Sequence, residues 1–495
     1  MPLPGRSALR RVAARGTALA VGAAMAGLTG LAAAPTAGAS PSAFAGTLRW
    51  APCDEPEEPG AECAALSVPV DWARPSGPRF DLAVARRQAA DPGARIGSMV
   101  FGPGGPGDSG VDRVVDQIGR FSPEVRRRFD IVSFDPRGVG RSSPVTCSPE
   151  VLAERPSPEL RSQADFDATV AYNKRLRADC RARTGPVFDH LDTAQTVQDL
   201  DALRAALGER KLTFHGSSYG TLLGAQYAET FPRRVRAMVL ESVMDHSVPT
   251  ARDFLRSGAA TAQDSFREFV KWCGGTARCA LHGRDVRAVW QSLLARAERG
   301  ELENPAKPGT ALSASDLVNT IAFRKFYRVD HTGLATAIAG LDASRPLPAS
   351  RPSTAPLAPV AAVFCSDWRL PVRDHREYAS LVATMNKAAP DLPHLLTLQM
   401  TASCLGAPTA NPQHRLDARG APPILLSNAL HDPATGYPWA VSVARQLGRS
   451  GVLLTYEGGG HGSVTRGPCM ENAVDSYLTG LKVPPRGTRC PAVPS

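Results

Sequence analysis

Short apolar runs rich in β-branched residues recur along the chain, each bounded by residues that favour turns. Runs of this length and composition predict strands that are buried on both faces of a sheet. Between them, apolar residues return every three or four positions, as at residues 193–207 and 220–230, which is the period of a helix. Strands that alternate with helices predict an α/β fold with a mostly parallel central sheet flanked by helices. The six predicted strands are at residues 98–101, 130–134, 212–215, 237–240, 424–426 and 452–456.

The strand pattern stops between residues 248 and 390, where helical patterns replace it. We interpret this stretch as a helical cap inserted into the α/β core. The expected organisation is a first core part at 40–247, the cap at 248–390 and a second core part at 391–495. The helices predicted inside the cap are at residues 251–273, 284–299, 314–326 and 376–388.

The first 39 residues have the pattern of a secretory signal peptide. Four arginines precede an apolar run at 16–34, and the segment contains no acidic residue. Ala37-Gly38-Ala39 then provides a small-x-small cleavage site. We therefore expect a signal peptide at residues 1–39 and a secreted, extracellular mature chain. A membrane anchor is the alternative, because the apolar run is long enough to span a bilayer, but the cleavage site favours removal.

The composition is that of a globular protein, with 43% hydrophobic and 21% charged residues in a chain of 495. The formal net charge of +10 falls to +6 once the four arginines of the signal peptide are removed. This charge is too dilute over so long a chain to indicate a nucleic-acid or membrane partner. We expect a monomer that binds no nucleic acid and has no stable membrane association.

All ten cysteines follow the predicted signal peptide. An even number of cysteines in an exported chain predicts disulfides. Because short loops close most readily, we expect each cysteine to pair with its neighbour in sequence. A zinc site is the alternative, but neither a C-x2-C pair nor an H-E-x-x-H motif occurs, so we expect no bound metal. The expected pairs are Cys53–Cys63, Cys147–Cys180, Cys273–Cys279, Cys365–Cys404 and Cys469–Cys490.

The segment 212–220 reads LTFHGSSYG, in which a predicted strand meets a glycine-flanked serine and then a predicted helix. This is the G-x-S-x-G pattern of a nucleophile elbow, whose glycines permit a strained turn that lifts the serine above the sheet edge. The N-terminus of the following helix favours developing negative charge. We predict that Ser218 is the nucleophile. The alternative is a serine in an ordinary glycine-rich turn.

A serine nucleophile needs a base and an acid that orients the base, and in this arrangement the acid and then the histidine follow the serine along the chain. Asp432 and His461 each follow a predicted strand, and they lie 29 residues apart, which leaves room for one helix and one strand. Both would then lie on neighbouring loops at the carboxyl edge of the sheet. We predict Asp432 as the acid and His461 as the base, with His431 as a competitor for the base.

The tetrahedral intermediate of acyl transfer needs backbone N–H donors. One is expected from Tyr219, the residue after the nucleophile, and a second from the loop 102–107, which reads GPGGPG. That loop also fits the G-x-G-x-x-G pattern of a dinucleotide site. Pro103 and Pro106 argue against such a site, because each removes an N–H that a pyrophosphate cradle needs. We therefore expect no organic cofactor.

Together the motifs resemble those of the secreted tripeptidyl aminopeptidases and, more distantly, the prolyl iminopeptidases, which are serine exopeptidases of the α/β-hydrolase fold. The resemblance covers most of the mature chain and implies that Gly104 supplies the second oxyanion N–H. It assigns nucleophile, acid and base to Ser218, Asp432 and His461. Prolyl iminopeptidases usually have a histidine where this chain has Pro103, which favours the tripeptidyl group. The motifs are GPGGPG, FDPRGVGRSSP, LDTAQTVQDLDALRAALG, GSSYG, FCSDW, ILLSNALHDPATGYPWA and GGGHG.

The resemblance also implies buried carboxylates that bind the protonated α-amine of a substrate. The candidates are Glu241 and Asp245, just past a predicted strand, and Asp367 in the cap. For each of them, a structural role in a loop or in an ion pair with an arginine is the alternative. For Asp135 and Arg137, in the FDPRG motif, we expect a structural ion pair near the oxyanion loop.

The predicted function is a secreted serine exopeptidase that acts through an acyl-enzyme, without a metal or organic cofactor. Its expected partners are peptide substrates with a free N-terminus, from which it releases short peptides, tripeptides in the tripeptidyl case. The alternatives are a secreted esterase or lipase-like hydrolase with the same triad, a prolyl aminopeptidase that releases single residues, and a binding protein built on an inactive hydrolase fold.

Overall fold

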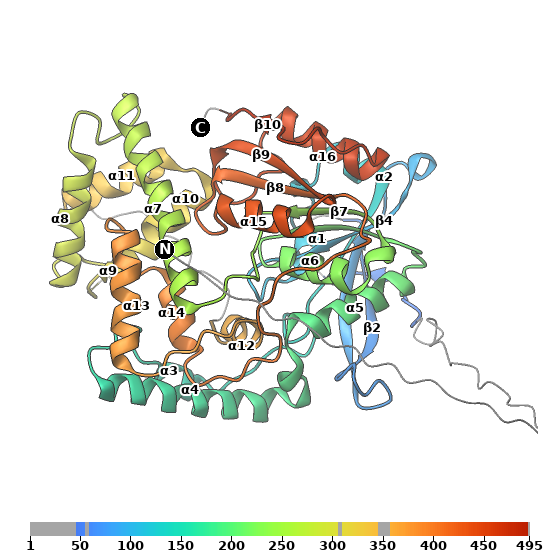
Figure 1. The fold of residues 1–495 in the computed structure, drawn as a ribbon, viewed down its shortest axis with the longest axis horizontal. Helices are drawn as coiled ribbons and strands as arrows, with labels where there is room; N and C mark the ends of the chain where they lie inside the picture. Colours follow the sequence, from blue (N-terminus) through green and yellow to red (C-terminus); the bar gives the residue numbers. More distant parts are fainter. Residues whose placement is uncertain (1–45, 55–58, 305–308, 345–356, 494–495) are drawn as a thin grey trace, which may run out of the picture. The chain divides into compact units, whose positions relative to one another are not determined.

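One mixed sheet organises the described part of the chain (Figure 1). The computed structural model describes residues 46–54, 59–304, 309–344 and 357–493. Within these residues ten strands are hydrogen-bonded in the order β1-β2-β3-β5-β4-β6-β7-β8-β9-β10. The strands are β1 (Ala51–Pro52), β2 (Ala61–Pro69), β3 (Arg79–Arg87), β4 (Gly97–Gly102), β5 (Phe129–Phe134), β6 (Leu212–Ser217), β7 (Val235–Glu241), β8 (Ile424–His431), β9 (Gly451–Gly459) and β10 (Arg489–Cys490).

The sheet is parallel from β5 across to β10, whereas β1, β2 and β3 pair antiparallel at one edge. All six predicted strands are present as β4 to β9, and each extends beyond its predicted range at one end or at both. Strands β1, β2, β3 and β10 were not predicted. In β3, buried and exposed side chains largely alternate, so this strand lacks the continuous apolar run of a strand covered on both faces.

Helices cover both faces of the parallel part of the sheet. Val100 of β4 packs in the hydrophobic cluster beneath α5, α6 and α15, whereas its neighbours Met99 and Phe101 pack in the cluster beneath α1, α2 and α16. Successive side chains of a strand point to opposite faces, so both faces of β4 must be apolar. The helices are α1 (Gly110–Val115), α2 (Pro123–Arg128), α5 (Thr193–Ala206), α6 (Gly220–Thr230), α15 (Tyr437–Leu447) and α16 (Pro468–Gly480).

The described chain between β7 and β8 is helical and contributes no strand to the sheet. Helix α7 packs on α13 and α14, and α8 packs on α11 (Figure 1). Buried aromatic rings join these helices, as where the Phe266 and Trp290 centroids lie 5.7 Å apart. The limits of 248 and 390 stay predictions, and helical structure continues past 390 through α14. The elements are α7 (Ala251–Gly275), α8 (Val286–Glu298), α9 (Ala314–Asp316), a π-helical segment (Leu317–Phe323), α10 (Arg324–Arg328), α11 (His331–Asp342), α12 (Leu357–Asp367), α13 (His375–Ala388) and α14 (Leu396–Ser403).

Two helices between β5 and β6 were also not predicted, α3 (Pro149–Ala153) and the 22-residue α4 (Gln163–Thr184). Only four residues of α4 are buried, and three of them are Phe166, Tyr172 and Cys180. A helix with so narrow a buried face gives a weak periodic signal, which explains why the sequence pattern did not indicate it.

All five expected disulfides are present, so the pairing of sequence neighbours is confirmed. The bond between Cys365 and Cys404 joins α12 to the end of α14, and that between Cys147 and Cys180 anchors α4. The predicted signal peptide lies outside the described residues. Within the described residues, no helix combines the length and the apolar character needed to cross a membrane.

Candidate active site

Ser218 lies in a sharp turn between β6 and α6. Its φ is +56°, in the left-handed region that non-glycine residues rarely adopt. The turn requires glycine on both sides, because a Cβ on Gly216 would lie 2.4 Å from Gly220 O, and one on Gly220 would lie 2.2 Å from Gly102 O. The backbone N–H of Ser218 donates to Glu241 O at the end of β7, at 2.8 Å. This is the geometry of a nucleophile elbow.

The imidazole of His461 is hydrogen-bonded to the carboxylate of Asp432. Nδ1 lies 2.9 Å from Oδ1 and 3.1 Å from Oδ2. Asp432 is buried directly after β8, and its Oδ1 also accepts from the backbone N–H groups of Ala434 and Thr435, at 2.9 and 3.0 Å. When Nδ1 donates to the acid, Nε2 is left to accept a proton. The pair has the arrangement of an acid that orients a base.

The charges around His461 favour its protonated form. Burial lowers the pKa of the imidazole, whereas the Asp432 carboxylate raises it through its charge and its hydrogen bond. The charge of Glu241 raises this pKa further, and that of Arg120 opposes the rise. The net effect is a pKa above the ordinary value for histidine. A base with a raised pKa takes a proton from a serine hydroxyl more readily.

Residues 460–464 form the loop that carries the predicted base, and we call them the base loop. Tyr327 of α10 contacts this loop. The His461 N–H donates to Tyr327 O at 3.0 Å, and the two rings lie with their centroids 4.5 Å apart. Tyr327 was not among the predicted site residues, because one aromatic residue in a helical stretch carries no signal of its own. Its contact with the base appears only in the fold.

The base loop also contacts Glu241 at the end of β7, a residue that is 2% exposed. Its Oε1 accepts from the backbone N–H groups of Ser463 and Val464, at 2.7 and 2.8 Å. Its Oε2 lies 3.2 Å from His215 Nε2 and 3.9 Å from an Arg120 guanidinium nitrogen. Burial would raise the pKa of Glu241, but the hydrogen bond from His215 and the neighbouring positive charge lower it to about 2. The carboxylate is therefore ionised at neutral pH.

Gly104 lies against the nucleophile, on the loop that follows β4. A Cβ at this position would lie 3.0 Å from Ser218 Cβ and 3.5 Å from Ser218 Oγ, so a glycine permits the close approach of the loop. Tyr219 follows the nucleophile at the N-terminus of α6, where backbone N–H groups lack partners within the helix. The two residues predicted to form the oxyanion hole therefore lie next to the nucleophile.

Comparison with known proteins agrees with this geometry. Residues 97–463 match the family model for the alpha/beta hydrolase fold. The chain belongs to the α/β-hydrolase family. This hydrolase is 34% identical over 491 residues to serine protease Hip1 of Mycobacterium tuberculosis, with 90% of this chain and 91% of that protein covered. The resemblance to the tripeptidyl aminopeptidases is also confirmed, since it is 30% identical over 469 residues to the tripeptidyl aminopeptidase of Streptomyces lividans, covering 87% and 83%.

An esterase is among the relatives as well. The hydrolase is 31% identical over 504 residues to carboxylesterase B of Mycobacterium tuberculosis, with 93% of this chain and 95% of that protein covered. The three relatives are named as a serine protease, a peptidase and an esterase, and these names all denote hydrolases of acyl bonds. Together they support serine hydrolase activity for this chain and leave the acyl donor to be determined.

Of the acids predicted to bind a substrate amine, Asp367 of α12 is surrounded by protein donors. Its carboxylate accepts from the Thr193 N–H and hydroxyl at 2.8 and 2.6 Å, from the Tyr219 hydroxyl at 2.6 Å, and from Asn411 Nδ2 at 2.8 Å. Burial raises the pKa of Asp367, and these hydrogen bonds oppose the rise. The residue joins α12 to the start of α5 and to the residue after the nucleophile.

Asp245 is also buried in a local network of its own. Its Oδ1 accepts from the Ser247 N–H and hydroxyl at 2.9 and 2.6 Å and from Gln446 Nε2 at 3.1 Å. The carboxylate of Asp245, like those of Glu241 and Asp367, therefore already has hydrogen-bond partners within the protein. The amine-binding roles of the three acids stay predictions, and their observed contacts connect segments of the fold.

The ion pair predicted between Asp135 and Arg137 is wrong. Arg137 pairs instead with Asp199 of α5, with Nε and a terminal nitrogen 2.8 and 2.7 Å from its carboxylate, and both side chains are fully buried. Asp135 accepts from the Ser109 hydroxyl at 2.5 Å and from the Arg141 N–H at 2.8 Å. The two side chains are two positions apart on a turn, and the fold directs them to different partners.

His431, the competitor for the base, is engaged elsewhere. Its Nδ1 lies 2.7 Å from Asp264 Oδ2 on α7, on the helical side of the molecule. This pair raises the pKa of His431 but does not involve Asp432. The histidine that meets the predicted acid is His461.

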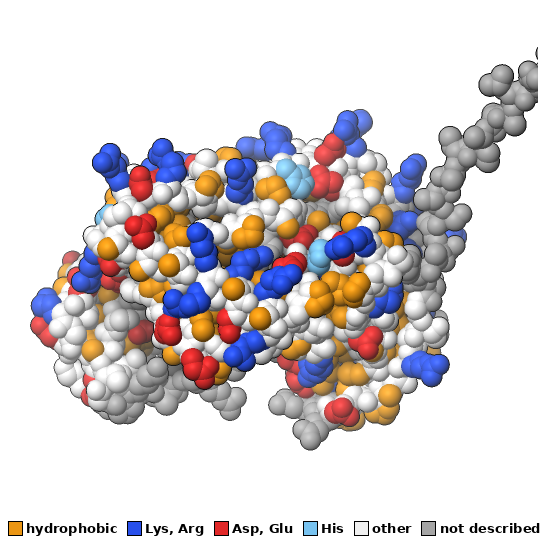
Figure 2. All heavy atoms as spheres, turned by 90° about the horizontal axis from the view of Figure 1, so that it is seen from below, with side chains coloured by type: hydrophobic (Ala, Val, Ile, Leu, Met, Phe, Trp, Pro, Cys, Tyr) orange, Lys and Arg blue, Asp and Glu red, His pale blue; other side chains and the backbone are white. Residues whose placement is uncertain are grey.

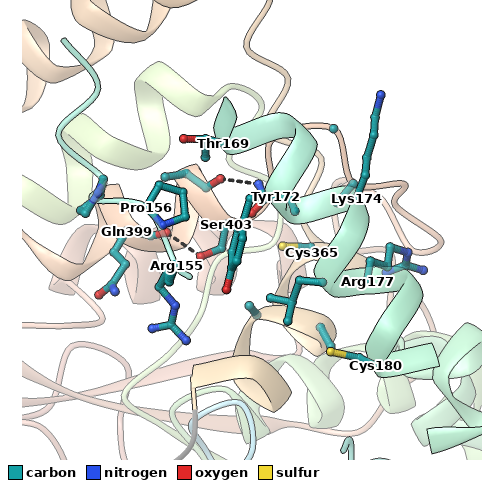
Figure 3. A pocket seen from close by; sticks show the side chains of 18 of the residues that line it. Arg155, Pro156, Thr169, Tyr172, Lys174, Arg177, Cys180, Cys365, Gln399 and Ser403 are labelled. Atoms are coloured by element: carbon teal, nitrogen blue, oxygen red, sulfur yellow. Dashed lines mark hydrogen bonds between the residues drawn. The ribbon is translucent and has the colours of Figure 1, made fainter. Parts of the chain in front are cut away.

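A separate cavity of about 90 Å³ lies between α4, α12 and α14 (Figure 3). Tyr172, Gln399 and Ser403 are among the residues that line it, and Lys174 and Arg177 lie along its edge on α4. None of the triad residues lines this cavity, so it is not part of the candidate active site.

On the face drawn in Figure 2, basic and acidic side chains are interspersed over the described surface. Nucleic-acid sites gather lysine and arginine into a continuous patch or stripe. The described side chains on this face form no such patch.

Proposed function

We propose that this α/β hydrolase is a secreted serine exopeptidase that releases tripeptides from free N-termini. The observation that carries the proposal is the Asp432–His461 pair, formed on the loops after β8 and β9 in the same fold that holds Ser218 in a strained elbow. The similarity to a tripeptidyl aminopeptidase over 87% of the chain supports the peptide class of substrate.

In the proposed reaction, Ser218 Oγ attacks the peptide carbonyl carbon while His461 Nε2 takes the hydroxyl proton. The N–H groups of Gly104 and Tyr219 hold the oxyanion of the tetrahedral intermediate. His461 then gives the proton to the leaving amine, and the C–N bond breaks to leave an ester on Ser218. Water, activated by the same imidazole, hydrolyses the ester, releases the N-terminal fragment and restores the serine. Asp432 orients the imidazole throughout.

Recognition of a substrate's free N-terminus calls for a carboxylate near the nucleophile to pair with the α-ammonium group. Asp108 is a further candidate for this carboxylate. It follows the oxyanion loop, its side chain is 29% exposed, and its Oδ2 pairs with Arg113 at 2.7 Å. Its Oδ1 lies 3.5 Å from the position that a Cβ on Gly105 would take, on the same loop as Gly104. This carboxylate is more accessible than those of Glu241, Asp245 and Asp367, which are each at most 5% exposed as residues.

The test compares three substrates that carry the same chromogenic amide: an unblocked tripeptide, an unblocked single amino acid and an N-acetylated tripeptide. The mature protein and Ser218→Ala are assayed side by side. Cleavage of the unblocked tripeptide alone, lost in Ser218→Ala, is the expected result. Preference for the single amino acid would instead favour an enzyme that releases single residues, as a prolyl aminopeptidase does. Full activity in Ser218→Ala would overturn the mechanism.

An esterase is the second candidate, because a relative named carboxylesterase B covers 93% of this chain. Fold and triad do not fix the acyl donor. An esterase would cleave short acyl esters that have no amine, and N-acetylation of a peptide would not affect it. Turnover of such esters at a kcat/KM well above that of the unblocked tripeptide would favour this candidate.

Secretion is proposed on the basis of the signal-peptide pattern and the five disulfides. Structural disulfides persist in oxidising compartments and are rare where glutathione keeps thiols reduced. Mass spectrometry of the protein recovered from culture medium tests both points, since it reports the N-terminal residue and the thiol content. An unprocessed N-terminus retained in the cells would contradict the proposal.

A further inference from the structure

We propose that Glu241 is a positioning residue that fixes the base loop relative to the nucleophile elbow. The proposal rests on the triad of the proposed function and goes beyond it. The residue stands at the end of β7, between β6, which leads to the nucleophile, and β8, which leads to the acid. From this place a single residue can contact both halves of the catalytic machinery.

The main chain of Glu241 contacts the nucleophile and its side chain contacts the base loop. The carbonyl oxygen accepts the Ser218 N–H at 2.8 Å. The carboxylate oxygen Oε1 accepts the N–H groups of Ser463 and Val464, at 2.7 and 2.8 Å, two and three residues after the base. A shift of Glu241 would therefore move the elbow and the base loop together, and its loss would release the base loop alone.

The next residue extends the same arrangement. Ser242 Oγ accepts the Gly462 N–H at 2.8 Å, so three consecutive amides after the base are fixed by two consecutive residues of one strand end. Ser242 has a φ of +58°, a conformation that costs free energy in a residue other than glycine. In this conformation the Ser242 hydroxyl oxygen accepts a hydrogen bond from the backbone of the base loop.

The charge of Glu241 is balanced on the side away from the base loop. Oε2 lies 3.2 Å from His215 Nε2 on β6 and 3.9 Å from Arg120. Arg120 is itself held over the Phe101 ring, 4.5 Å from its centroid. A buried carboxylate is stable when hydrogen bonds and a neighbouring cation replace water, and this one has both. The negative charge therefore persists beside the base.

Four titratable groups of the described residues act on His461 or lie against it: the Asp432 carboxylate at Nδ1, the Glu241 carboxylate, the Arg120 guanidinium next to Glu241, and the Tyr327 ring. The first two stabilise the imidazolium, and the third opposes them. Replacing Glu241 by a neutral residue removes one stabilising charge while Arg120 stays. The imidazole should then titrate at lower pH than in the wild type.

The engaged contacts separate this role from the amine-binding role predicted for Glu241. Oε1 already accepts two backbone N–H groups, and Oε2 faces a histidine and an arginine. A substrate ammonium would have to displace one of these buried partners. A positioning residue affects kcat for every substrate, whereas an amine ligand affects KM for substrates that have a free amine.

The experiment compares Glu241→Gln and Glu241→Ala with the wild type, and uses Asp130→Asn as a matched control. Asp130 is likewise buried, accepts the Ala89 N–H at 2.9 Å and pairs with Arg95 at 2.8 Å. It lies near the start of β5, at the amino ends of the parallel strands, whereas the candidate site lies at their carboxyl ends. Measurements are kcat and KM for the unblocked tripeptide amide, the pH dependence of kcat/KM, the melting temperature, and the rate of labelling by a fluorophosphonate.

We expect kcat to fall about tenfold in Glu241→Gln, whose amide oxygen can still accept the two N–H groups, and about a hundredfold in Glu241→Ala. KM should change less than twofold, and the acidic limb of kcat/KM should move to lower pH in Glu241→Gln. Labelling by the fluorophosphonate should slow in the same order. Asp130→Asn should lower the melting temperature without any of these changes.

Two results would overturn the proposal. One is a folded Glu241→Gln with wild-type kcat, labelling rate and acidic limb. The other is a rise in KM for unblocked substrates with kcat intact, which would assign Glu241 to the amine. Should Glu241→Ala fail to fold, Ser242→Ala replaces it, with an expected loss of about tenfold in kcat. If the wild type is labelled but does not cleave the tripeptide, the exopeptidase proposal fails, while the labelling rates still test Glu241.

Discussion

The phenol ring of Tyr327 lies with its centroid 4.5 Å from that of the His461 imidazole, and its carbonyl oxygen accepts the His461 N–H at 3.0 Å. One residue of α10 thus contacts the proposed base twice, through its main chain and through its side chain. The helical segment between β7 and β8 therefore contacts the proposed base directly.

Removing the Tyr327 ring should slow the reaction while leaving the main-chain contact in place. In Tyr327→Ala the imidazole loses the ring that restricts its tilt, so we expect kcat to fall about tenfold or more. Tyr327→Phe keeps the ring and should retain most of the activity. The measurement is kcat for the best substrate, with the melting temperature as a check on folding. Equal losses in both variants would show that the hydroxyl matters and the ring does not.

The pH dependence of kcat/KM should report the raised pKa of His461. The base must be neutral to accept the serine proton, so activity should fall as pH drops through a pKa above the ordinary value of about 6.5. In Asp432→Asn the main source of that rise is lost, and the acidic limb should move to lower pH. The same change should reduce kcat by about 10⁴, because the wrong imidazole tautomer is favoured. An unmoved acidic limb would exclude His461 as the titrating group.

That the three proposed triad residues lie just beyond strand ends could be predicted from the sequence, because each follows an apolar strand. Ser218 follows β6, Asp432 follows β8, and His461 lies two residues beyond β9, so the strand pattern alone brings them to one sheet edge. The partners of buried charges could not be predicted this way. Arg137 meets Asp199 from 62 residues away, and nothing in the FDPRG motif distinguishes that partner from the neighbouring Asp135.

The same limit applies to the residues that hold the base. The sequence marks Glu241 as an acid at a strand end, which fits an amine ligand as well as a structural group. Its partners Ser463 and Val464 lie more than 200 residues further along the chain and contribute only backbone N–H groups, which any residue type could supply. Tyr327 lies beside a π-helical segment that interrupts the predicted helix 314–326, so no helical pattern could orient its ring. Such contacts depend on the register of loops and not on residue identity.

Breaking the buried pair of Arg137 and Asp199 should destabilise the fold strongly. Both side chains are 0% exposed, and Asp199 also accepts the Trp72 indole N–H at 2.7 Å. Asp199→Ala leaves the guanidinium buried without a counter-charge, so we expect the free energy of unfolding to fall by about 3–5 kcal/mol. Denaturation by urea measures it. Asp71→Ala, which removes the partner of exposed Arg74, is the matched control and should have little effect; equal losses in the two variants would contradict the prediction.

Glu241 should also contribute to the loss of stability in acid. Its pKa is about 2 in the folded chain and near 4.5 when unfolded. Because the folded pKa is depressed, its contribution is fully present above about pH 4.5 and is lost as pH falls toward 2. The stability difference between wild type and Glu241→Gln should therefore shrink over that range, as measured by denaturation at several pH values. Exposed Glu457→Gln is the control. A difference that stays constant from pH 5 to pH 3 would argue against this titration.

The close approach of Gly104 to Ser218 makes the oxyanion loop sensitive to a single methyl group. In Gly104→Ala the new Cβ would lie 3.0 Å from Ser218 Cβ and 3.1 Å from Ser217 O, so the loop must move away from the nucleophile. The proposed N–H donor moves with it, and loss of one oxyanion donor costs about 10²–10³ in kcat.

Gly119→Ala is the matched control for Gly104→Ala, because no heavy atom outside its immediate chain neighbours lies within 4 Å of the added methyl group. We expect wild-type kcat in the control and nearly unchanged melting temperatures in both variants. Single-turnover labelling by a chromogenic ester separates acylation from deacylation, and both steps should slow in Gly104→Ala because both pass through an oxyanion. If Gly104→Ala kept its kcat, the second donor would have to come from another residue of the loop. The close packing of Gly104 would then serve only to shape the elbow.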